Sequence, residues 1–195
     1  RAGVGLDNVD AVAAQAKGIT VANTPAATSI SVAEHAFALM LALARHVTIG
    51  DKTTKEGKWE RKALEGTELY GKTIGILGFG RIGQEVAKRA KAFHMNVIVC
   101  DTVLDSEIVA ALEVESGSID EVLKKSDYIS LHLPITDKTR NLINADRIAT
   151  MKKGVRIINT ARGGLIDNDA LVKAVQSGQV AGAAIDVYDK EPAVK

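Results

Sequence analysis

The chain has 195 residues, of which 46% are hydrophobic, 25% charged and 4% aromatic. This apolar fraction excludes a disordered chain and suffices for the core of one ordinary domain, with room for a fragment of another. The 25 Lys and Arg residues balance 24 Asp and Glu residues, so the formal net charge is +1. Such a balance gives no electrostatic footprint for nucleic acid or an anionic membrane.

The cysteine content and the longest apolar run exclude two further classes of protein. Cys100 is the only cysteine, which excludes an intramolecular disulfide framework and a multi-cysteine zinc site. The longest uninterrupted apolar stretch, Ala36–Ala44, is about half of what a bilayer requires. We therefore expect a protein of the reducing cytoplasm, without a metal site.

The first 70 residues predict few regular elements. Residues 19–22 favour a short strand, and the Asn-Thr-Pro that follows must leave regular structure. Ser31 and Glu34 have the spacing of a capping box, which predicts a helix from about Ser31 to Ala44. This helix is apolar on almost every side, so we expect its burial either within its own domain or against a second subunit or domain. Residues 51–68 are polar and indicate a surface connection.

From about residue 72, short apolar runs alternate with amphipathic helical patterns. The runs are nearly continuous, as is typical of parallel strands covered on both faces. The predicted strands are Thr73–Leu77, Val97–Asp101, Tyr128–Leu131, Val155–Asn159 and Ala183–Val187. The predicted helices are Arg81–Phe93, Asp120–Lys125 and Asp167–Ser177. This alternation predicts βαβ units, and hence an α/β fold with a doubly wound parallel sheet.

A glycine-rich turn joins the first of these strands to the first of these helices. The six residues from Gly78 to Gly83 fit G-x-G-x-x-G in the strand–turn–helix context of a Rossmann-type fold. Gly78 permits the tight turn, Gly80 lets the backbone approach a pyrophosphate, and Gly83 allows close helix–strand packing. The N–H groups at the start of the helix, near Arg81 and Ile82, would then hold the phosphates. The alternative is a glycine-rich turn that binds no ligand.

A carboxylate predicts which dinucleotide the turn would bind. Asp101 lies 18 positions after Gly83, at the end of the next predicted strand. There it can accept hydrogen bonds from the ribose hydroxyls and would repel a 2′-phosphate. The next residue is Thr102 rather than an arginine. NAD is therefore favoured over NADP.

Two more groups of polar residues follow the later strands, where open α/β sheets bind ligands. Residues 160–164 (TARGG) place Arg162 beside two glycines, so it either meets a carboxylate and a carbonyl or forms a structural ion pair. Asp186 lies in the last predicted strand, and Glu191 precedes a proline. Glu191 can orient a catalytic base, although spacing alone favours a solvated surface residue.

No histidine is an obvious catalytic base. His35 and His46 lie on or near the apolar helix, and His94 ends another helix. His132 follows a predicted strand, where it either lines the cofactor cleft or is a hydrogen-bonded loop residue. Cys100 is most simply a small buried hydrophobe in its strand.

Taken together, these segments resemble the D-isomer-specific 2-hydroxyacid dehydrogenases along essentially the whole chain. The glycine turn alone is shared by unrelated proteins, but the full set of segments is highly specific. The matching segments are Arg1–Asp10 (RAGVGLDNVD), Asn23–Pro25, Val32–His35 (VAEH), Gly78–Gly83 with Asp101, His132–Pro134, Asn159–Gly164 (NTARGG) and Asp186–Pro192 (DVYDKEP).

The resemblance implies roles for individual residues. Arg162 would bind the substrate carboxylate and polarise its carbonyl, while Glu191 would pair with the catalytic histidine. Gly3 and Val4 would cradle the substrate carboxylate, and Arg1 would meet a phosphate. The cofactor-binding residues implied are Gly78, Gly80, Arg81, Ile82, Gly83, Asp101, His132, Leu133, Pro134, Thr160, Ala161 and Asp186.

The resemblance also implies a domain organisation. Residues 1–24 would be a fragment of the substrate-binding domain with its hinge, and residues 25–195 an NAD-binding domain incomplete at its C-terminal end. The family's catalytic histidine lies in a Pro-His-x-Gly segment beyond Glu191-Pro192, outside this sequence. We therefore expect this polypeptide to bind NAD without turning over.

Within the family, the chain is most similar to members that oxidise 3-phosphoglycerate to 3-phosphohydroxypyruvate, which opens the phosphorylated route to serine. The segments behind this are Arg1–Asp10, Gly57–Arg61 and Gly66–Leu69. One alternative is a glyoxylate or hydroxypyruvate reductase, and another is an NAD-sensing corepressor that works through partner proteins. The apolar helix resembles the family's subunit-contact helix, so we expect a homodimer or higher homo-oligomer.

Overall fold

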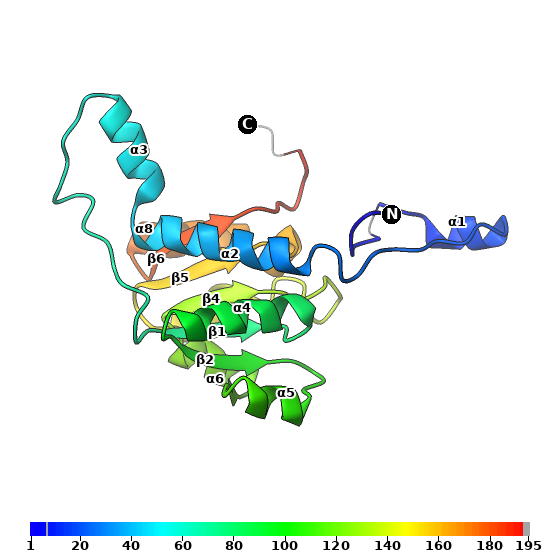
Figure 1. Cartoon of the computed structure of the whole chain (residues 1–195). Coiled ribbons are helices and arrows are strands. Elements are labelled where there is room, and N and C mark those ends of the chain that lie inside the picture. Colours follow the sequence, from blue (N-terminus) through cyan, green and yellow to red (C-terminus); the bar gives the residue numbers. More distant parts are fainter. Residues whose placement is uncertain (7, 193–195) are drawn as a thin grey trace.

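Six parallel strands form one sheet in the order β3-β2-β1-β4-β5-β6 (Figure 1). This computed structural model describes residues 1–6 and 8–192. Asp7, from the predicted Arg1–Asp10 segment, and residues 193–195 lie outside the described residues. The strands are β1 Thr73–Leu77, β2 Asn96–Cys100, β3 Glu115–Ser116, β4 Tyr128–Leu131, β5 Val155–Asn159 and β6 Val180–Ile185. This strand order is that of the doubly wound Rossmann fold, which confirms the predicted fold class.

Helices cover both faces of the sheet, and this explains why the strands are apolar on both sides. The helices are α1 Ala11–Ala16, α2 Ser29–Ala44, α3 Val47–Lys55, α4 Arg81–Ala92, α5 Ser106–Ala111, α6 Ile119–Lys125, α7 Ala145–Thr150 and α8 Asn168–Ser177, with a short 3-10 helix at Gly163–Leu165. In β2, Val97 and Val99 contribute to the core under α2 and α4, while Ile98 faces the core under α6, α7 and α8. Most residues of β1, β4 and β5 are therefore buried, on one face of the sheet or the other.

Two predictions for the amino-terminal third are wrong. Residues 19–22 form no strand, because they pair only irregularly with residues 1–4, as in the bond from the Arg1 amino group to Ala22 O at 2.7 Å. The long helix begins at Ser29 rather than near Ser31, since the Ser31 hydroxyl donates to Thr28 O at 3.0 Å and caps nothing. The predicted surface connection also begins later, because α3 continues to Lys55.

The long helix α2 is buried on one face only. Ala33, Ala36, Phe37, Met40 and Ala44 face the core, and α2 lies beside α4 over the sheet (Figure 1). It packs closely on β6, because a Cβ added at Gly182 would lie 2.7 Å from Leu43 Cδ1. The outer face of α2 is partly open in this chain.

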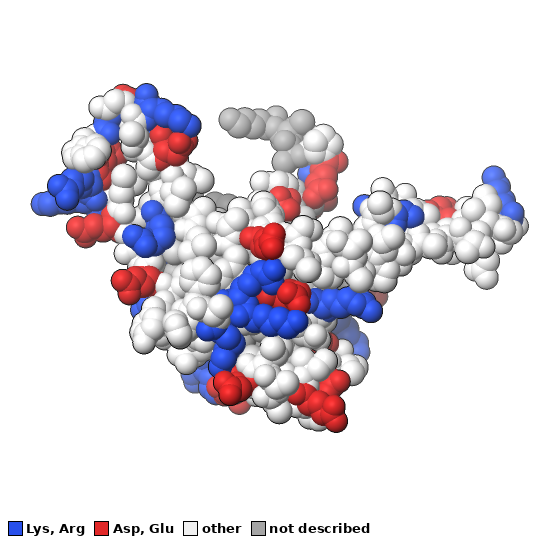
Figure 2. Space-filling model, in the orientation of Figure 1, with Lys and Arg blue, Asp and Glu red and all other residues white. Residues whose placement is uncertain are grey.

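The distribution of charged side chains agrees with the balanced numbers of acidic and basic residues in the sequence. Lys and Arg side chains are interspersed with Asp and Glu over the face shown in Figure 2.

Within the described residues, no single helix is long and apolar enough to cross a membrane. The helices α2 and α3 pass such a test only together, and a 62° bend separates them.

Candidate functional site

The turn after β1 has the geometry that its glycines predict. Gly78 adopts φ +97°, and a Cβ added there would lie 2.6 Å from His132 O. A Cβ at Gly83 would lie 2.1 Å from Gly78 O, so α4 approaches the turn as closely as backbone allows. A Cβ at Gly80 would meet nothing within 4 Å, and Gly80 is also the uncapped N-terminus of α4. The space outside Gly80 and the N–H groups of α4 are therefore open to an anionic ligand.

Asp101 directly follows β2 and holds this turn from the side. Its Oδ2 accepts a hydrogen bond from Phe79 N at 2.6 Å, and its Oδ1 accepts one from Thr102 N at 2.6 Å. A carboxylate oxygen can accept more than one hydrogen bond, so Oδ2 keeps capacity for a ligand hydroxyl. Asp101 thus lies where the sequence places it, beside the glycine turn, and it also fixes the shape of that turn.

His132 lies behind the turn as a neutral, hydrogen-bonded residue. The ring Nε2 and the Ser130 hydroxyl are 2.8 Å apart, and the backbone N–H of His132 donates to Leu77 O at 2.7 Å. Burial lowers the pKa of His132 to about 4, so the ring carries no charge at neutral pH. His132 is therefore a hydrogen-bonded residue, and it also lines the cleft described next; that this cleft holds the cofactor stays a prediction.

A cleft of about 320 Å³, which we call the turn cleft, lies beyond the carboxyl ends of β4 and β5. Its lining residues are Val4, Gly5, Thr28, Val32, Ile82, His132, Leu133, Pro134, Thr160, Ala161 and Arg162. Eight of these, Val4 and the seven from Ile82 to Arg162, are residues that the sequence singles out as site residues. Thr28, the N-cap of α2, and Val32 within α2 receive no site role from the sequence, because only the packing of α2 over β5 and β6 brings them there.

A second depression of about 330 Å³, the arginine hollow, adjoins the turn cleft. It shares Gly5, Ala161 and Arg162 with that cleft. Its lining residues are Arg1, Gly5, Ala161, Arg162, Gly163, Val187, Tyr188 and Glu191. The hollow therefore brings together three charged residues from distant parts of the chain, each of which the sequence indicates as a site residue.

The turn that carries Arg162 is fixed by Asn159, the last residue of β5. Asn159 is fully buried; its Nδ2 donates to Arg162 O at 2.9 Å and its Oδ1 accepts from Ala161 N at 3.0 Å. The Arg162 Nη1 donates to Ala161 O at 2.7 Å. A Cβ at Gly163 would lie 2.2 Å from the carbonyl carbon of Tyr188, so only glycine lets the two loops approach. The signal for Asn159 is a polar residue that closes an apolar strand.

The segment after β6 supplies the remaining acidic residues. Glu191 Oε1 accepts from Tyr188 N at 3.0 Å, which folds its carboxylate back over the loop at the edge of the arginine hollow. Asp186 lies outside the linings of both depressions, and its Oδ1 is 3.3 Å from His35 Nε2 of α2. The pairing of His35 with Asp186 was not expected from the sequence.

Some predicted residues line neither depression. The three turn glycines, Arg81 and Asp101 lie at the turn itself, beside the cleft. Gly3 also lines neither, and its N–H donates to Thr24 Oγ1 at 2.8 Å. In its place Gly5 contributes backbone to both depressions.

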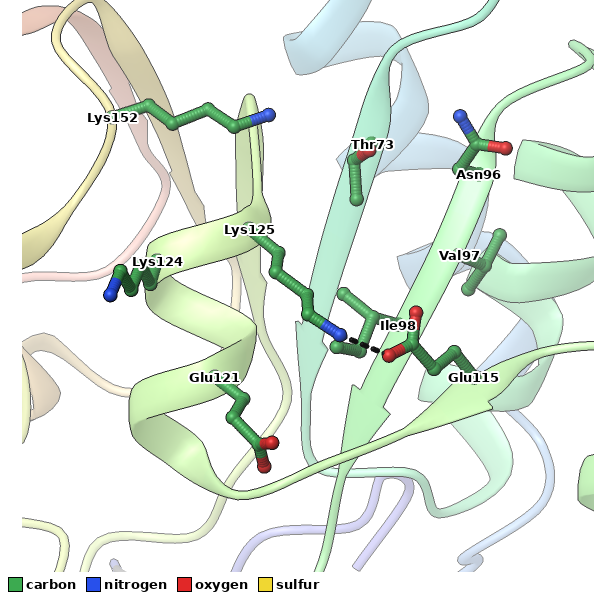
Figure 3. Close-up of a pocket in the computed structure, with 9 residues that line it drawn as sticks. All are labelled: Thr73, Asn96, Val97, Ile98, Glu115, Glu121, Lys124, Lys125 and Lys152. Carbon is green, nitrogen blue, oxygen red and sulfur yellow. Dashed lines mark hydrogen bonds and ion pairs between the residues drawn. The ribbon is translucent and has the colours of Figure 1, made fainter.

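A depression larger than these two lies at the amino ends of the strands, and Figure 3 shows the residues that line it. This lysine groove has a volume of about 780 Å³ and is bounded by Thr73, Asn96, Val97, Ile98, Glu115, Glu121, Lys124, Lys125 and Lys152. Thr73 and Asn96 are the first residues of β1 and β2, so the groove lies at the amino ends of the strands. Its lysines have acidic neighbours: Lys125 pairs with Glu115, and Lys152 Nζ is 3.0 Å from Asp127 Oδ1. Open α/β sheets bind ligands at the opposite edge.

The residues around the turn fit a dinucleotide. The space at Gly80 would admit a pyrophosphate, and Thr160 Oγ1 is buried without a hydrogen-bond partner among the residues described. A buried hydroxyl without a partner is costly, so a ligand atom in the turn cleft would relieve it. Across residues 1–6 and 8–192, no group of three or more His, Cys, Asp or Glu side chains could hold a metal ion.

Comparisons with known proteins agree with this geometry. The family model described as "D-isomer specific 2-hydroxyacid dehydrogenase, NAD binding domain" matches residues 37–195. The chain is 55% identical over 192 residues to a hydroxypyruvate reductase from Thermotoga maritima, covering 98% of the chain and 62% of that protein. It is 51% identical over 193 residues to a D-3-phosphoglycerate dehydrogenase from Methanocaldococcus jannaschii, covering 98% of the chain and 37% of that protein.

A solved structure extends the agreement to three dimensions. The crystal structure of D-lactate dehydrogenase from Aquifex aeolicus, complexed with NAD and lactic acid, superposes with a TM-score of 0.86 at 41% identity. The match covers 97% of this chain and 57% of that one. The chain therefore spans between about a third and two thirds of the length of these relatives.

Proposed function

Since the chain belongs to the D-isomer-specific 2-hydroxyacid dehydrogenase family and carries its NAD-binding domain, we propose that it serves an enzyme that oxidises 3-phosphoglycerate to 3-phosphohydroxypyruvate. This reaction opens the phosphorylated route to serine. The observation that carries the proposal is the meeting of Arg1, Arg162 and Glu191 at one hollow, which adjoins the cleft for the cofactor. Two guanidinium groups suit a substrate with both a carboxylate and a phosphate.

The turn and the turn cleft would hold NAD along its length. The pyrophosphate would lie at Gly80 and the N–H groups of Arg81 and Ile82, and the adenosine ribose would donate to Asp101. The nicotinamide end would enter the turn cleft between His132-Leu133-Pro134 and Thr160-Ala161. When bound, NAD supplies the acceptor for the hydride that leaves the hydroxyl-bearing carbon.

Arg162 and Glu191 would contribute alignment and charge. The Arg162 fork would bind the substrate carboxylate and stabilise negative charge that develops on the carbonyl oxygen. Glu191 would pair with the histidine that accepts the hydroxyl proton. Among the described residues, no histidine lines the arginine hollow. We therefore expect the 195-residue chain to bind NAD without oxidising substrate.

The alternative substrate is hydroxypyruvate or glyoxylate, each without a phosphate. The relative that favours it is the Thermotoga maritima hydroxypyruvate reductase, at 55% identity. The two proposals differ at Arg1, whose guanidinium also donates to Asn8 Oδ1 and would contact the substrate only if the substrate carries a second anionic group.

Calorimetry with paired ligands separates these proposals. We expect the chain to bind NAD more tightly than NADP, and the chain saturated with NADH to bind 3-phosphohydroxypyruvate more tightly than hydroxypyruvate. Arg1→Met should reduce that preference roughly tenfold, the loss of one charge-assisted contact. Lys17→Met, which removes a cation from a site remote from the hollow, is the matched control. Equal binding of the two keto acids by the unmodified chain would favour the reductase, and absence of NAD binding would overturn both proposals.

The proposal also includes a domain division, an interface between two copies of the chain, and a cellular setting. Residues 1–24 would belong to a substrate-binding domain with its hinge, and residues 25–195 to the NAD-binding domain. Two copies would associate through the outer face of α2, where Ile30 is 57% exposed. The setting would be the reducing cytoplasm, which the single Cys100 favours.

A further inference from the structure

A glutamine near the start of α4 reaches back to the glycine turn. The side-chain Nε2 of Gln84 donates to Phe79 O at 3.1 Å, and the backbone N–H of Gln84 donates to Gly80 O at 3.0 Å. The second bond is the ordinary bond of a helix to its N-cap, but the first is not, because Phe79 lies outside α4. Gln84 thus connects α4 to a residue of the turn itself.

Phe79 is held through its side chain, its N–H and its carbonyl. The residue is 4% exposed and belongs to the core under α2 and α4. Its N–H donates to Asp101 Oδ2 at 2.6 Å, and its carbonyl accepts from Gln84. In the part of the chain that the structure describes, no other hydrogen bond to this carbonyl is present. The orientation of the peptide between Phe79 and Gly80 therefore depends on Gln84.

The same peptide carries the N–H of Gly80. A trans peptide is planar, so its carbonyl and its N–H point in opposite directions. Because the Phe79 carbonyl is directed at Gln84, the Gly80 N–H is directed away from that side chain. Gly80 is exposed, and none of the described residues accepts a hydrogen bond from its N–H. This donor is therefore left for a ligand in the open space at Gly80.

The glycine makes this peptide easy to reverse. A peptide reverses when ψ of the residue before it and φ of the residue after it change together, and glycine tolerates the positive φ that results. Gly80 adopts φ −71° and has no side chain to oppose the change. After reversal the Phe79 carbonyl would replace the Gly80 N–H on the outer side, and its partial negative charge would repel a phosphate. A donor that holds the carbonyl prevents this reversal.

We propose that Gln84 is a positioning residue that holds the Phe79 carbonyl, so that the Gly80 N–H stays directed outward and donates to the pyrophosphate of NAD. This inference rests on the proposed function, since it assumes that a pyrophosphate lies at Gly80. Gln84 itself touches no part of the cofactor, and its amide supplies the donor without adding a charge beside the phosphates.

The test compares NAD and ADP-ribose with adenosine, which has no pyrophosphate, by calorimetry and NMR titration. Gln84→Met keeps the length of the side chain and removes the donor. It should weaken the binding of NAD and of ADP-ribose by the same factor, roughly tenfold, the loss of one charge-assisted hydrogen bond. Adenosine binding should not change, because the bond from Phe79 N to Asp101 does not involve Gln84. Gln176→Met, the same substitution at an exposed position of α8, is the matched control.

A spectroscopic signal separates this role from a general loss of structure. In the isotope-labelled unmodified chain, ADP-ribose should move the amide proton of Gly80 downfield, as a hydrogen bond to a phosphate does. Gln84→Met should reduce that shift, and denaturant unfolding of the variant checks that it remains folded.

Three results would each overturn the inference: unchanged affinities in Gln84→Met, a Gly80 signal that moves as it does in the unmodified chain, or equal weakening of adenosine. If the unmodified chain binds neither NAD nor ADP-ribose, the proposed function fails and the inference fails with it. If it binds both, any failure belongs to the inference alone.

Discussion

Gly80 and Gly83 belong to one turn, but different surroundings require a glycine at each. A Cβ at Gly83 would overlap the carbonyl oxygen of Gly78, whereas a Cβ at Gly80 would meet no atom of the protein. The fold itself therefore requires Gly83. Gly80 is required only if something outside the protein must approach the backbone there.

This difference gives a test with an internal control. Gly83→Ala should lower the free energy of unfolding by about 2–3 kcal/mol, the cost of an overpacked backbone contact. Gly80→Ala should lower it by about 1 kcal/mol or less, as a poorer N-cap, yet weaken NAD binding roughly tenfold. Denaturant unfolding and calorimetry measure the two quantities. A Gly80→Ala chain with undiminished NAD affinity would show that the pyrophosphate does not approach this backbone.

His132 predicts a pH dependence of stability. Its folded-state pKa of about 4 lies below the ordinary value of 6.5, so the unfolded chain takes up a proton that the folded chain refuses. Stability from this group is complete above pH 6.5 and is lost as the pH falls from 6.5 towards 4. The loss amounts to about 3 kcal/mol at most.

Urea unfolding between pH 7 and pH 4.5 measures this loss. We expect His132→Gln, which keeps a partner for Ser130 but cannot titrate, to flatten the decline of unfolding free energy with falling pH. His94→Asn is the control, because His94 is exposed and adopts φ 55°, which asparagine tolerates. Identical slopes for His132→Gln and the unmodified chain would contradict the prediction.

At the scale of elements, two serines show why a capping pattern needs its structural context. Ser118 forms a true capping box before α6: its N–H donates to Glu121 Oε2 at 2.8 Å, and Glu121 N donates back to Ser118 Oγ at 3.3 Å. Ser31 has the same spacing to Glu34, but it lies inside α2, and Glu34 pairs with Arg89 of α4 instead. The packing of α2 on α4 thus overrides the local pattern.

The two serines should respond differently to the same substitution. Ser118→Ala should lower the free energy of unfolding by about 1 kcal/mol, because it removes an N-cap. Ser31→Ala should change it by less than about 0.5 kcal/mol, since alanine suits a helix interior. Thermal unfolding of the two variants side by side measures the contrast. Equal losses would mean that Ser31 has a capping role that its hydrogen bonds do not show.

The strands could be predicted from the sequence wherever both faces are buried. Residues 73–77, 128–131 and 155–159 match β1, β4 and β5 residue for residue. The last strand is predicted at Ala183–Val187, but it begins at Val180 and ends at Ile185. Its start is not predicted, because the small residues Ala181 and Gly182 give little β signal. The strand β3 and the helices α1, α5 and α7 have two to six residues, too few for a periodic pattern.

The candidate site likewise contains residues whose positions could be predicted from the sequence and residues whose positions could not. The glycine turn, Asp101, Arg162 and Glu191 have local sequence signatures, so their positions could be predicted. The contributions of Thr28, Val32 and His35 could not, because they depend on where α2 packs on the sheet. Such pairings belong to tertiary structure, and a single sequence carries no record of them.

At the scale of the whole molecule, α2 both covers the sheet and leaves apolar groups outside. Ile30 on α2, with Val47 and Ile49 on α3, is at least half exposed, and these side chains belong to successive elements. A contiguous patch of such groups is what another chain would cover, whereas single exposed apolar residues are ordinary. A second copy is the occupant proposed above.

Sedimentation velocity at micromolar concentration tests this association. We expect the unmodified chain to sediment as a dimer, and Ile30→Glu to shift it to a monomer, because the variant would bury an unpaired charge. Val103→Glu, at a position 83% exposed and remote from α2 in the fold, should remain a dimer. A monomeric unmodified chain, or three chains that behave alike, would argue against an interface on α2.

The hydrogen bond from Phe79 N to Asp101 has a consequence for protein engineering. A redesign that makes the chain accept NADP would begin by removing the Asp101 carboxylate, which repels a 2′-phosphate. That change would also remove the acceptor 2.6 Å from Phe79 N, in the middle of the phosphate-binding turn. Cofactor preference and turn conformation thus both depend on the carboxylate of Asp101. A successful exchange needs a neutral residue that still accepts this bond, such as asparagine or serine, before any arginine is introduced for the new phosphate.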